Sequence, residues 1–441
     1  MYGNQNQNFF TKSFNKSVTQ RFPQNYPNLK GDFTTSTFST ANSSQNINPN
    51  ITFYISFSTG QTFKINANQY HSFESVFNEF LKENFIEGFK NSIKCILCEA
   101  NTIEYNKSLI NNKIMQNSRV LCYIDNTITI EQGKKHGHGF RFYGVFTKKG
   151  RNLQNEASKI NQDTPLVYLN LGNIKGFNMF GVFDGHGLKG DKISQFCRYY
   201  FVLKMNDYAY KCQKQNISNP EDIYYKLKST NFQFINDCFT NADIEMTKQK
   251  DLEYNWSGTT CTLVIQLNFH LICASVGDSR SIIIYDDGTK TNQGIAVFSK
   301  DHLPNLPNEM ARIIKSGGMV KRLQNNLGQE VGRYRVFKSG QKHPGLPISR
   351  SLGDFIAKEC GVINQPDLME LTINQNIKYL IIGSGGLWRY LKNEDIRNVG
   401  NIYYQQGDIK FFCSKLVEYA VETWEKKDYC RDDITIVGVF F

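Results

Sequence analysis

The stretch FGVFDGHG, residues 180–187, joins a short apolar run to a polar, glycine-rich end. The apolar residues are typical of a buried β-strand, and they bring Asp184 to the end of that strand. The glycines on both sides of His186 allow the backbone to turn sharply and to come close to an ion. DGHG alone is compatible with an ordinary turn, but its position directly after this strand favours a functional site.

Further short motifs surround this stretch in a definite order. Most of them are strands or turns that carry small residues and acids, and they are GVFTKKG (144–150), NQD (161–163), SGTTCTLVIQL (257–267), ICASVGDSRSIIIY (272–285), KDHLPNLPNEMARIIKSGGMV (300–320), GLPISRSLGD (345–354), GVINQPD (361–367), YLIIGSGGLW (379–388) and DDITIVGV (432–439). Each motif is weak by itself, whereas the whole set in this order is specific.

The set resembles the PPM (PP2C-like) family of metal-dependent protein serine/threonine phosphatases over about residues 140–441. The resemblance implies an α+β fold, an α/β/β/α sandwich of two antiparallel sheets flanked by helices, with a metal site at one end. It also implies two Mg²⁺ or Mn²⁺ ions that activate a water molecule for attack on the phosphorus of phosphoserine or phosphothreonine in a protein. Such hard ions prefer oxygen ligands.

The resemblance also assigns metal-site roles to particular residues. Asp184 would bridge both ions, and the Gly185 carbonyl would bind one of them. Asp163 would orient metal-bound water, and Asp278 would hold a third, weaker ion. Asp163 and Asp278 also suit ordinary turns, where aspartate is common.

At the C-terminal motif, Asp432 would ligate the other ion. Its neighbour Asp433 is excluded because successive strand residues point to opposite faces, and the family pattern favours Asp432. Asp354 is predicted to be structural rather than a ligand, and Trp388 is predicted to lie in the core.

Catalysis would further need an acid and a phosphate-binding cation. By resemblance, His186 would protonate the leaving serine or threonine oxygen. A basic residue near NQD should bind the phosphate, but the spacing departs here from the family. Lys149 is preferred, with Arg151 as the second choice.

One position departs from the family in a way that affects the metal site. The family reads SDGLW where this chain reads SGGLW, so Gly385 replaces an expected aspartate ligand. Loss of an outer partner alone typically costs about 10- to 100-fold in metal affinity or activity, and loss of a direct ligand should cost at least that. Pro347 and Arg389 also depart from the usual residues.

Two functions follow from this departure. Gly385 favours a catalytically impaired pseudophosphatase that acts as a docking or structural subunit, and this is our prediction. The intact FDGHG motif favours the alternative, an active Mn²⁺- or Mg²⁺-dependent protein serine/threonine phosphatase. Phosphoproteins would be its substrates.

The N-terminal third has a different pattern. Residues 1–49 are rich in Asn, Gln, Ser and Thr and predict a flexible or partner-ordered tail with several aromatic residues. Residues 51–65 predict a β-hairpin around Thr59-Gly60, and residues 72–82 predict an amphipathic helix capped by Ser72. Strands at 93–98 and 119–125 would follow.

This order of strands and helix resembles the ubiquitin-like β-grasp fold, which implies a docking module over residues 50–126. Residues 127–139 would form a linker before the phosphatase-like domain at 140–441. The linker's His136 and His138 are predicted to have no metal role. We therefore expect protein partners for the tail and the ubiquitin-like module.

Composition gives weaker limits. The 11 cysteines include one C-x-x-C pair, Cys95 and Cys98, without a second pair at zinc-finger spacing, so reduced core thiols are expected. The net charge of +11 is spread along the chain, and nothing else indicates nucleic-acid binding. The absence of an apolar run of membrane-spanning length predicts no membrane association and a cytoplasmic protein. A cytoskeletal or ciliary location is a further expectation from the Asn-, Gln- and Lys-rich composition.

Overall fold

The computed structural model describes most of the chain. The described residues are 50–57, 62–83, 93–98, 101–102, 107–109, 111, 119–124, 142–151, 159–249, 252–286, 293–428 and 430–441. The predicted tail, the turn at Thr59-Gly60 and the linker with His136 and His138 lie outside them. In the described part, no helix is long and apolar enough to span a membrane.

The N-terminal region contains a five-stranded sheet with the order β2-β1-β5-β3-β4. β1 pairs with β5 in parallel and with β2 antiparallel, while β3 pairs antiparallel with β4 and β5. Helix α1 lies between β2 and β3 in the chain. The bounds are β1 Asn50–Phe57, β2 Thr62–Asn68, α1 Phe73–Glu83, β3 Ile93–Cys98, β4 Asn101–Thr102 and β5 Arg119–Ile124.

Local sequence explains the first elements of this region. Phe53 and Ile55 alternate along β1 and are fully buried, as the period of two in a half-buried strand requires. Helix α1 buries Phe73 and Phe77, whose rings stack at 5.2 Å. The Ser72 hydroxyl accepts a hydrogen bond from the backbone N–H of Ser75 at 3.2 Å, so the predicted N-cap is confirmed.

The remaining strands form two larger antiparallel sheets and a small one. The first has the order β17-β9-β8-β10-β11-β18, with β7 also pairing with β8, and the second has the order β13-β12-β19-β20-β6. The bounds of their strands are β6 Phe142–Lys148, β7 Asp163–Tyr168, β8 Phe177–His186, β9 Gly258–Thr259, β10 Cys261–Leu267, β11 His270–Val276, β12 Arg280–Asp286, β13 Gln293–Val297, β17 Leu352–Gly353, β18 Asp367–Thr372, β19 Ile377–Gly383 and β20 Ile434–Phe440.

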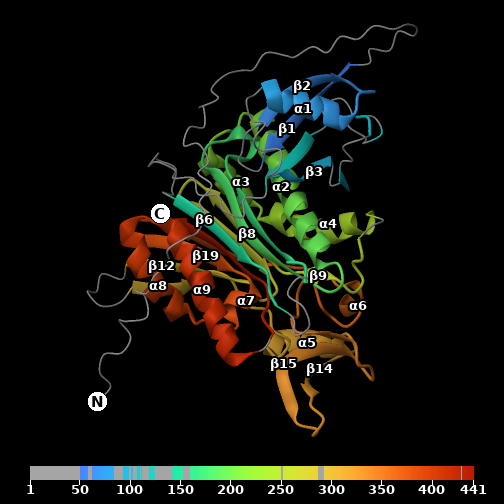
Figure 1. The fold of residues 1–441 in the computed structure, drawn as a ribbon, viewed down its shortest axis with the longest axis vertical. Coiled ribbons are helices and arrows are strands. Elements are labelled where there is room, and N and C mark those ends of the chain that lie inside the picture. The colour runs from blue at the N-terminus through green and yellow to red at the C-terminus, as the bar shows by residue number, and fades with distance from the viewer. Residues whose placement is uncertain are drawn as a thin grey trace. The chain divides into compact units, whose positions relative to one another are not determined.

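Helices lie on both outer faces of this pair of sheets (Figure 1). Helices α2, α3 and α4 cover the first sheet, and α8 and α9 cover the second. The helix bounds are η2 Leu171–Asn173, α2 Gly190–Lys214, α3 Pro220–Ser229, α4 Gln233–Thr247, α5 Pro307–Lys315, α6 Phe355–Lys358, α7 Gly385–Trp388, α8 Asn393–Gln406 and α9 Ile409–Lys427.

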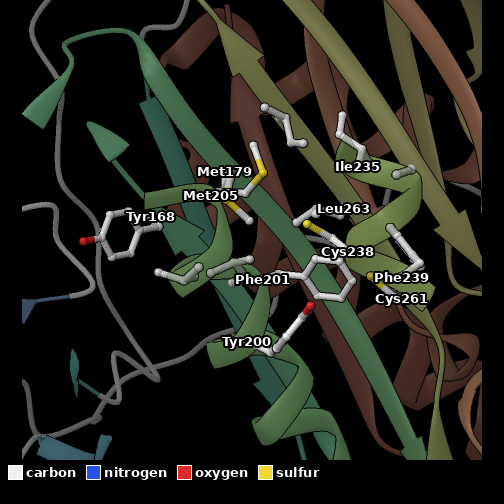
Figure 2. Close-up of a cluster of buried hydrophobic side chains, with 14 of the residues drawn as sticks. Tyr168, Met179, Tyr200, Phe201, Met205, Ile235, Cys238, Phe239, Cys261 and Leu263 are labelled. Atoms are coloured by element: carbon white, nitrogen blue, oxygen red, sulfur yellow. The ribbon is translucent and has the colours of Figure 1, made fainter. Parts of the chain in front are cut away.

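Three apolar clusters account for this layered arrangement. Figure 2 shows the first cluster, in which Phe201 of α2 and Phe239 of α4 pack together beside Leu263 of β10. A second cluster fills the space between the sheets, and a third lies between the second sheet and α8 and α9. Because both sheets are covered on both faces, their central strands are continuous apolar runs rather than alternating ones. The predicted sandwich of antiparallel sheets and flanking helices is therefore present.

A smaller sheet projects from this body next to α5. It has the order β14-β15-β16, with bounds β14 Gly318–Gln324, β15 Glu330–Lys338 and β16 Pro344–Leu346. Figure 1 draws β14 and β15 as a long orange hairpin. The base of this region is tied by Glu309 of α5, which is buried and pairs with Arg312 and Arg350.

Candidate metal centre

Strands β7 and β8 bring two acids side by side. Asp163 is the residue paired with Asp184 in the antiparallel ladder. Asp163 is buried, and neither of its carboxylate oxygens has a hydrogen-bond partner among the described residues. Burial and the nearby charge of Asp433 raise the pKa of Asp163 to about 7. The Ser384 and Thr435 hydroxyls are near enough to lower this pKa in part, but neither makes a hydrogen bond of normal geometry, so water or a cation can complete the surroundings of the carboxylate.

Asp184 lies among other carboxylates. Burial and the charges of Asp163, Asp432 and Asp278 raise its pKa well above the ordinary value. The Gly385 backbone N–H donates a hydrogen bond to Asp184 Oδ2 at 2.8 Å and offsets part of this effect. The mutual repulsion of these acids makes the site suited to a bound cation.

The adjacent acids Asp432 and Asp433 have different surroundings. Asp433 is buried, and its carboxylate accepts the backbone N–H groups of Gly150 at 2.6 Å and Gln162 at 2.9 Å. It therefore joins three segments of the chain. The Asp432 side chain is 57% exposed, and its charge is among those that raise the pKa of Asp184.

Gly185 occupies a close backbone contact beside these acids. A Cβ added there would lie 2.3 Å from the Gly190 carbonyl oxygen and 2.6 Å from that of Gln162. No side chain fits at this position, because the backbones of Gln162 and Gly190 approach the end of β8 too closely.

Gly385 faces the same acids from the start of α7. A Cβ added at Gly385 would lie 3.0 Å from Asp184 Oδ2 and 3.9 Å from Asp278 Oδ1. A carboxylate at position 385 would therefore enter this group of acids. Asp278, in the turn between β11 and β12, instead forms an ion pair with Arg333 of β15.

His186 and Asp354 form a second functional pair. The His186 Nε2 atom lies 2.7 Å from Asp354 Oδ2, and Asp354 is buried. Burial lowers the pKa of His186, but the charge and hydrogen bond of Asp354 outweigh it and raise that pKa to about 8. The raised pKa favours the protonated ring, which can donate a proton. Asp354, which the sequence placed in a structural role, is the partner that holds this ring.

Lys159 is the basic side chain that the structure places against the acids. Its Nζ lies 3.4 Å from Asp432 Oδ1 and 3.2 Å from Asp433 Oδ1. Lys149 is exposed, and the Arg151 side chain lies 3.9 Å from Glu425. Sequence spacing pointed to Lys149 and Arg151. The sequence could have indicated Lys159, because this basic residue lies two positions before NQD.

The side chains that could bind a metal ion differ between the two sides of Asp184. Asp163, Asp184 and Asp432 supply carboxylate oxygens, which suit a hard divalent cation. On the other side, Gly385 supplies no side-chain oxygen and Asp278 is already paired with Arg333. Among the described residues, no group of three or more His, Cys, Asp or Glu side chains is arranged to hold a metal ion.

Comparison with known proteins now identifies the family. The family model "Protein phosphatase 2C" matches residues 154–427, more than half of the chain. The chain belongs to the protein phosphatase 2C family. PP2C phosphatases are Mg²⁺- or Mn²⁺-dependent and act on phosphoprotein substrates.

Individual PP2C relatives cover the same region. "Probable protein phosphatase 2C 34" of Arabidopsis thaliana is 26% identical over 302 residues, which are 67% of this chain and 80% of the plant protein. "Probable protein phosphatase 2C 41" of the same plant is 29% identical over 312 residues, covering 68% of this chain and 82% of the relative. The solved serine-threonine phosphatase 2C from Toxoplasma gondii has a TM-score of 0.59 at 21% identity, covering 71% of this chain and 99% of that one. This structural likeness confirms the PP2C fold.

Proposed function

We propose that this protein is a catalytically impaired PP2C-type serine/threonine phosphatase (a pseudophosphatase) that acts as a docking or structural subunit. The observation that carries the proposal is Gly385. The position faces Asp184 and Asp278, and glycine brings no oxygen to it. Loss of a charged ligand weakens both the binding of a divalent cation and the electrostatic stabilisation of the transition state.

The chain keeps the groups that would act directly on a phosphorylated side chain. Metal ions, when bound in PP2C enzymes, supply an activated water molecule. His186 holds a proton that can pass to the leaving serine or threonine oxygen, and Asp354 fixes the ring that carries it. Lys159 places a positive charge beside Asp432, where it can attract a phosphate group.

The alternative function is that of an active Mg²⁺- or Mn²⁺-dependent protein serine/threonine phosphatase. The His186–Asp354 pair favours it, because a protein that only docks has no need of a protonated histidine at this position. Water would then replace the carboxylate that is absent at Gly385.

Turnover with Mn²⁺ separates the two functions. The full chain is assayed with an aryl phosphate and with a phosphothreonine peptide, beside the variants Gly385→Asp, Gly385→Ala and Asp184→Ala. We expect a wild-type rate near background and an increase of about 10- to 100-fold for Gly385→Asp. Gly385→Ala adds the same Cβ near Asp184 without a carboxylate, so it should give no increase.

The outcome that contradicts impairment is equally definite. It is a wild-type rate equal to that of Gly385→Asp and abolished by Asp184→Ala, which would support the active enzyme.

For the N-terminal region we propose a ubiquitin-like docking module. Its support is the strand order β2-β1-β5-β3-β4, with the parallel β1–β5 pair and helix α1 between β2 and β3. The partners would be proteins, and a cytoplasmic, cytoskeletal or ciliary location remains a prediction. A pull-down with residues 50–126 deleted from the full chain tests the module, since partners that bind through it should be lost.

A further inference from the structure

One positively charged side chain of the β14–β15 hairpin, Arg333, reaches the acids of the metal centre. Arg333 Nη1 donates to Asp278 Oδ2, and the Asp278 side chain is only 9% exposed. The Arg333 side chain is 34% exposed, so the pair lies at the boundary between the centre and solvent. Since arginine stays charged at every physiological pH, this positive charge is permanent.

A local irregularity of the hairpin aims Arg333 at this position. The strand register moves from Lys321–Arg335 to Leu323–Val331, so three residues of β15 lie opposite the single residue Arg322. Extra residues of this kind bend a strand and redirect its side chains. Gly332, directly before Arg333, has φ 75°, a left-handed conformation that glycine adopts without strain.

Arg333 and Gly385 both lie next to the Asp278 carboxylate, and the surroundings of that carboxylate are called the Asp278 corner below. A Cβ at Gly385 would lie 3.9 Å and 4.0 Å from the two carboxylate oxygens of Asp278. The corner thus lacks one expected negative charge and holds one added positive charge. Arg335, on the same strand, is near enough to Arg333 that burial and the charges of Arg333 and Arg389 lower its pKa. Both changes disfavour a divalent cation beside Asp278.

We propose that Arg333 is a built-in counter-cation for Asp278 that competes with divalent ions at this corner. With no ligand at Gly385 and Asp278 paired with Arg333, we expect no more than one ion to bind, on the side of Asp163, Asp184 and Asp432. This inference does not depend on how fast the protein hydrolyses phosphate esters. Its test measures ion binding, so it fails independently of the activity test on Gly385.

The test is calorimetric titration of the metal-free full chain with Mn²⁺. Arg333→Gln should bind Mn²⁺ about tenfold more tightly than wild type or gain a second site, because the competing charge is gone. Arg333→Met, which keeps much of the side chain's length, is the second variant if the glutamine variant does not fold, and the same result is expected.

Two controls separate charge from structure. Arg333→Lys keeps the charge and should bind Mn²⁺ as wild type does. Arg322→Gln removes one charge from the opposite strand, where Arg322 lies over the Tyr334 ring at 4.7 Å, and should also match wild type. Equal Mn²⁺ affinity in wild type and in folded Arg333→Gln or Arg333→Met would overturn the proposal. So would two ions bound by wild type, or an increase in Arg333→Lys as large as that in Arg333→Gln.

Discussion

The metal centre has two edges, one formed by His186 and Asp354 and the other by Gly385 and Asp278, and they differ in which catalytic or metal-binding side chains are present. At one edge, His186 and Asp354 form a short pair with a buried carboxylate and a protonated ring. At the other edge, Gly385 provides only a backbone N–H, and Asp278 is paired with Arg333. The proton-donating edge thus keeps its groups, while the cation-binding edge has exchanged negative charge for positive.

The backbone around Asp184 is well ordered by hydrogen bonds despite the missing carboxylate at Gly385. The Gly385 N–H still bonds Asp184, and the β7–β8 ladder still pairs Asp163 with Asp184. The two edges therefore differ in their side chains, while the backbone contacts around Asp184 are intact at both.

The largest expected effect concerns the proton donor. In a Gly385→Asp background, where turnover can be measured, His186→Gln should lower hydrolysis of a phosphothreonine peptide by about 100-fold or more, because an alkoxide leaving group needs a proton. Hydrolysis of nitrophenyl phosphate should fall much less, since nitrophenolate leaves without one. Equal losses on both substrates, in steady-state assays, would remove His186 from the role of acid.

An intermediate effect is expected for the partner of that histidine. Asp354→Asn removes the largest of the charges that offset burial, so the pKa of His186 should fall from about 8 towards or below its ordinary value of about 6.5, with Asp184 and Asp278 still raising it in part. An NMR titration of the metal-free chain measures this pKa, with His186→Gln identifying the resonance. A pKa that stays near 8 would contradict the pairing.

The same pair predicts how stability depends on pH. The pKa of His186 is raised on folding, so its contribution is complete below about 6.5 and is lost as the pH rises through about 8. The pKa of Asp354 is lowered, so its contribution is present above its ordinary value and is lost as the pH falls further. The difference in unfolding free energy between wild type and Asp354→Asn should therefore be largest near pH 5 to 6 and shrink above 8.

The smallest expected effect concerns the phosphate-binding cation. In the Gly385→Asp background, Lys159→Ala should raise the KM for the phosphopeptide and weaken inhibition by inorganic phosphate about two- to fivefold, the scale of a partly exposed charge interaction. Lys149→Ala, at an exposed position, is the matched control and should change neither. The reverse pattern would return the role to Lys149.

Much of the fold could be predicted from sequence because local chemistry determines it. Ser72 caps α1, and the apolar run before Asp184 forms β8. Strand alternation did not separate Asp432 from Asp433, because both precede β20 and both contact the Lys159 ammonium group. The position of Gly385 beside Asp184 followed from a family motif and not from any local pattern.

The rest of the site depends on contacts between distant segments. Asp354 is 168 residues from His186, and Arg333 is 55 residues from Asp278, so no periodicity links either pair. Lys159 was missed for a different reason. The chain between Arg151 and Lys159 is longer than the family spacing. The prediction placed the phosphate-binding residue before these extra residues, at Lys149, whereas Lys159 follows them and lies two residues before NQD.

Position 385 has room for a side chain that points toward Asp184, and this affects how easily mutation could restore the carboxylate. The nearest obstacle is the tip of the Asp184 side chain, which can move, and the backbone there is not in a left-handed conformation. The glycine codons GGU and GGC become aspartate codons by a single base change. Where Gly385 is encoded by GGU or GGC, one base change restores the carboxylate in a position that the backbone already accepts.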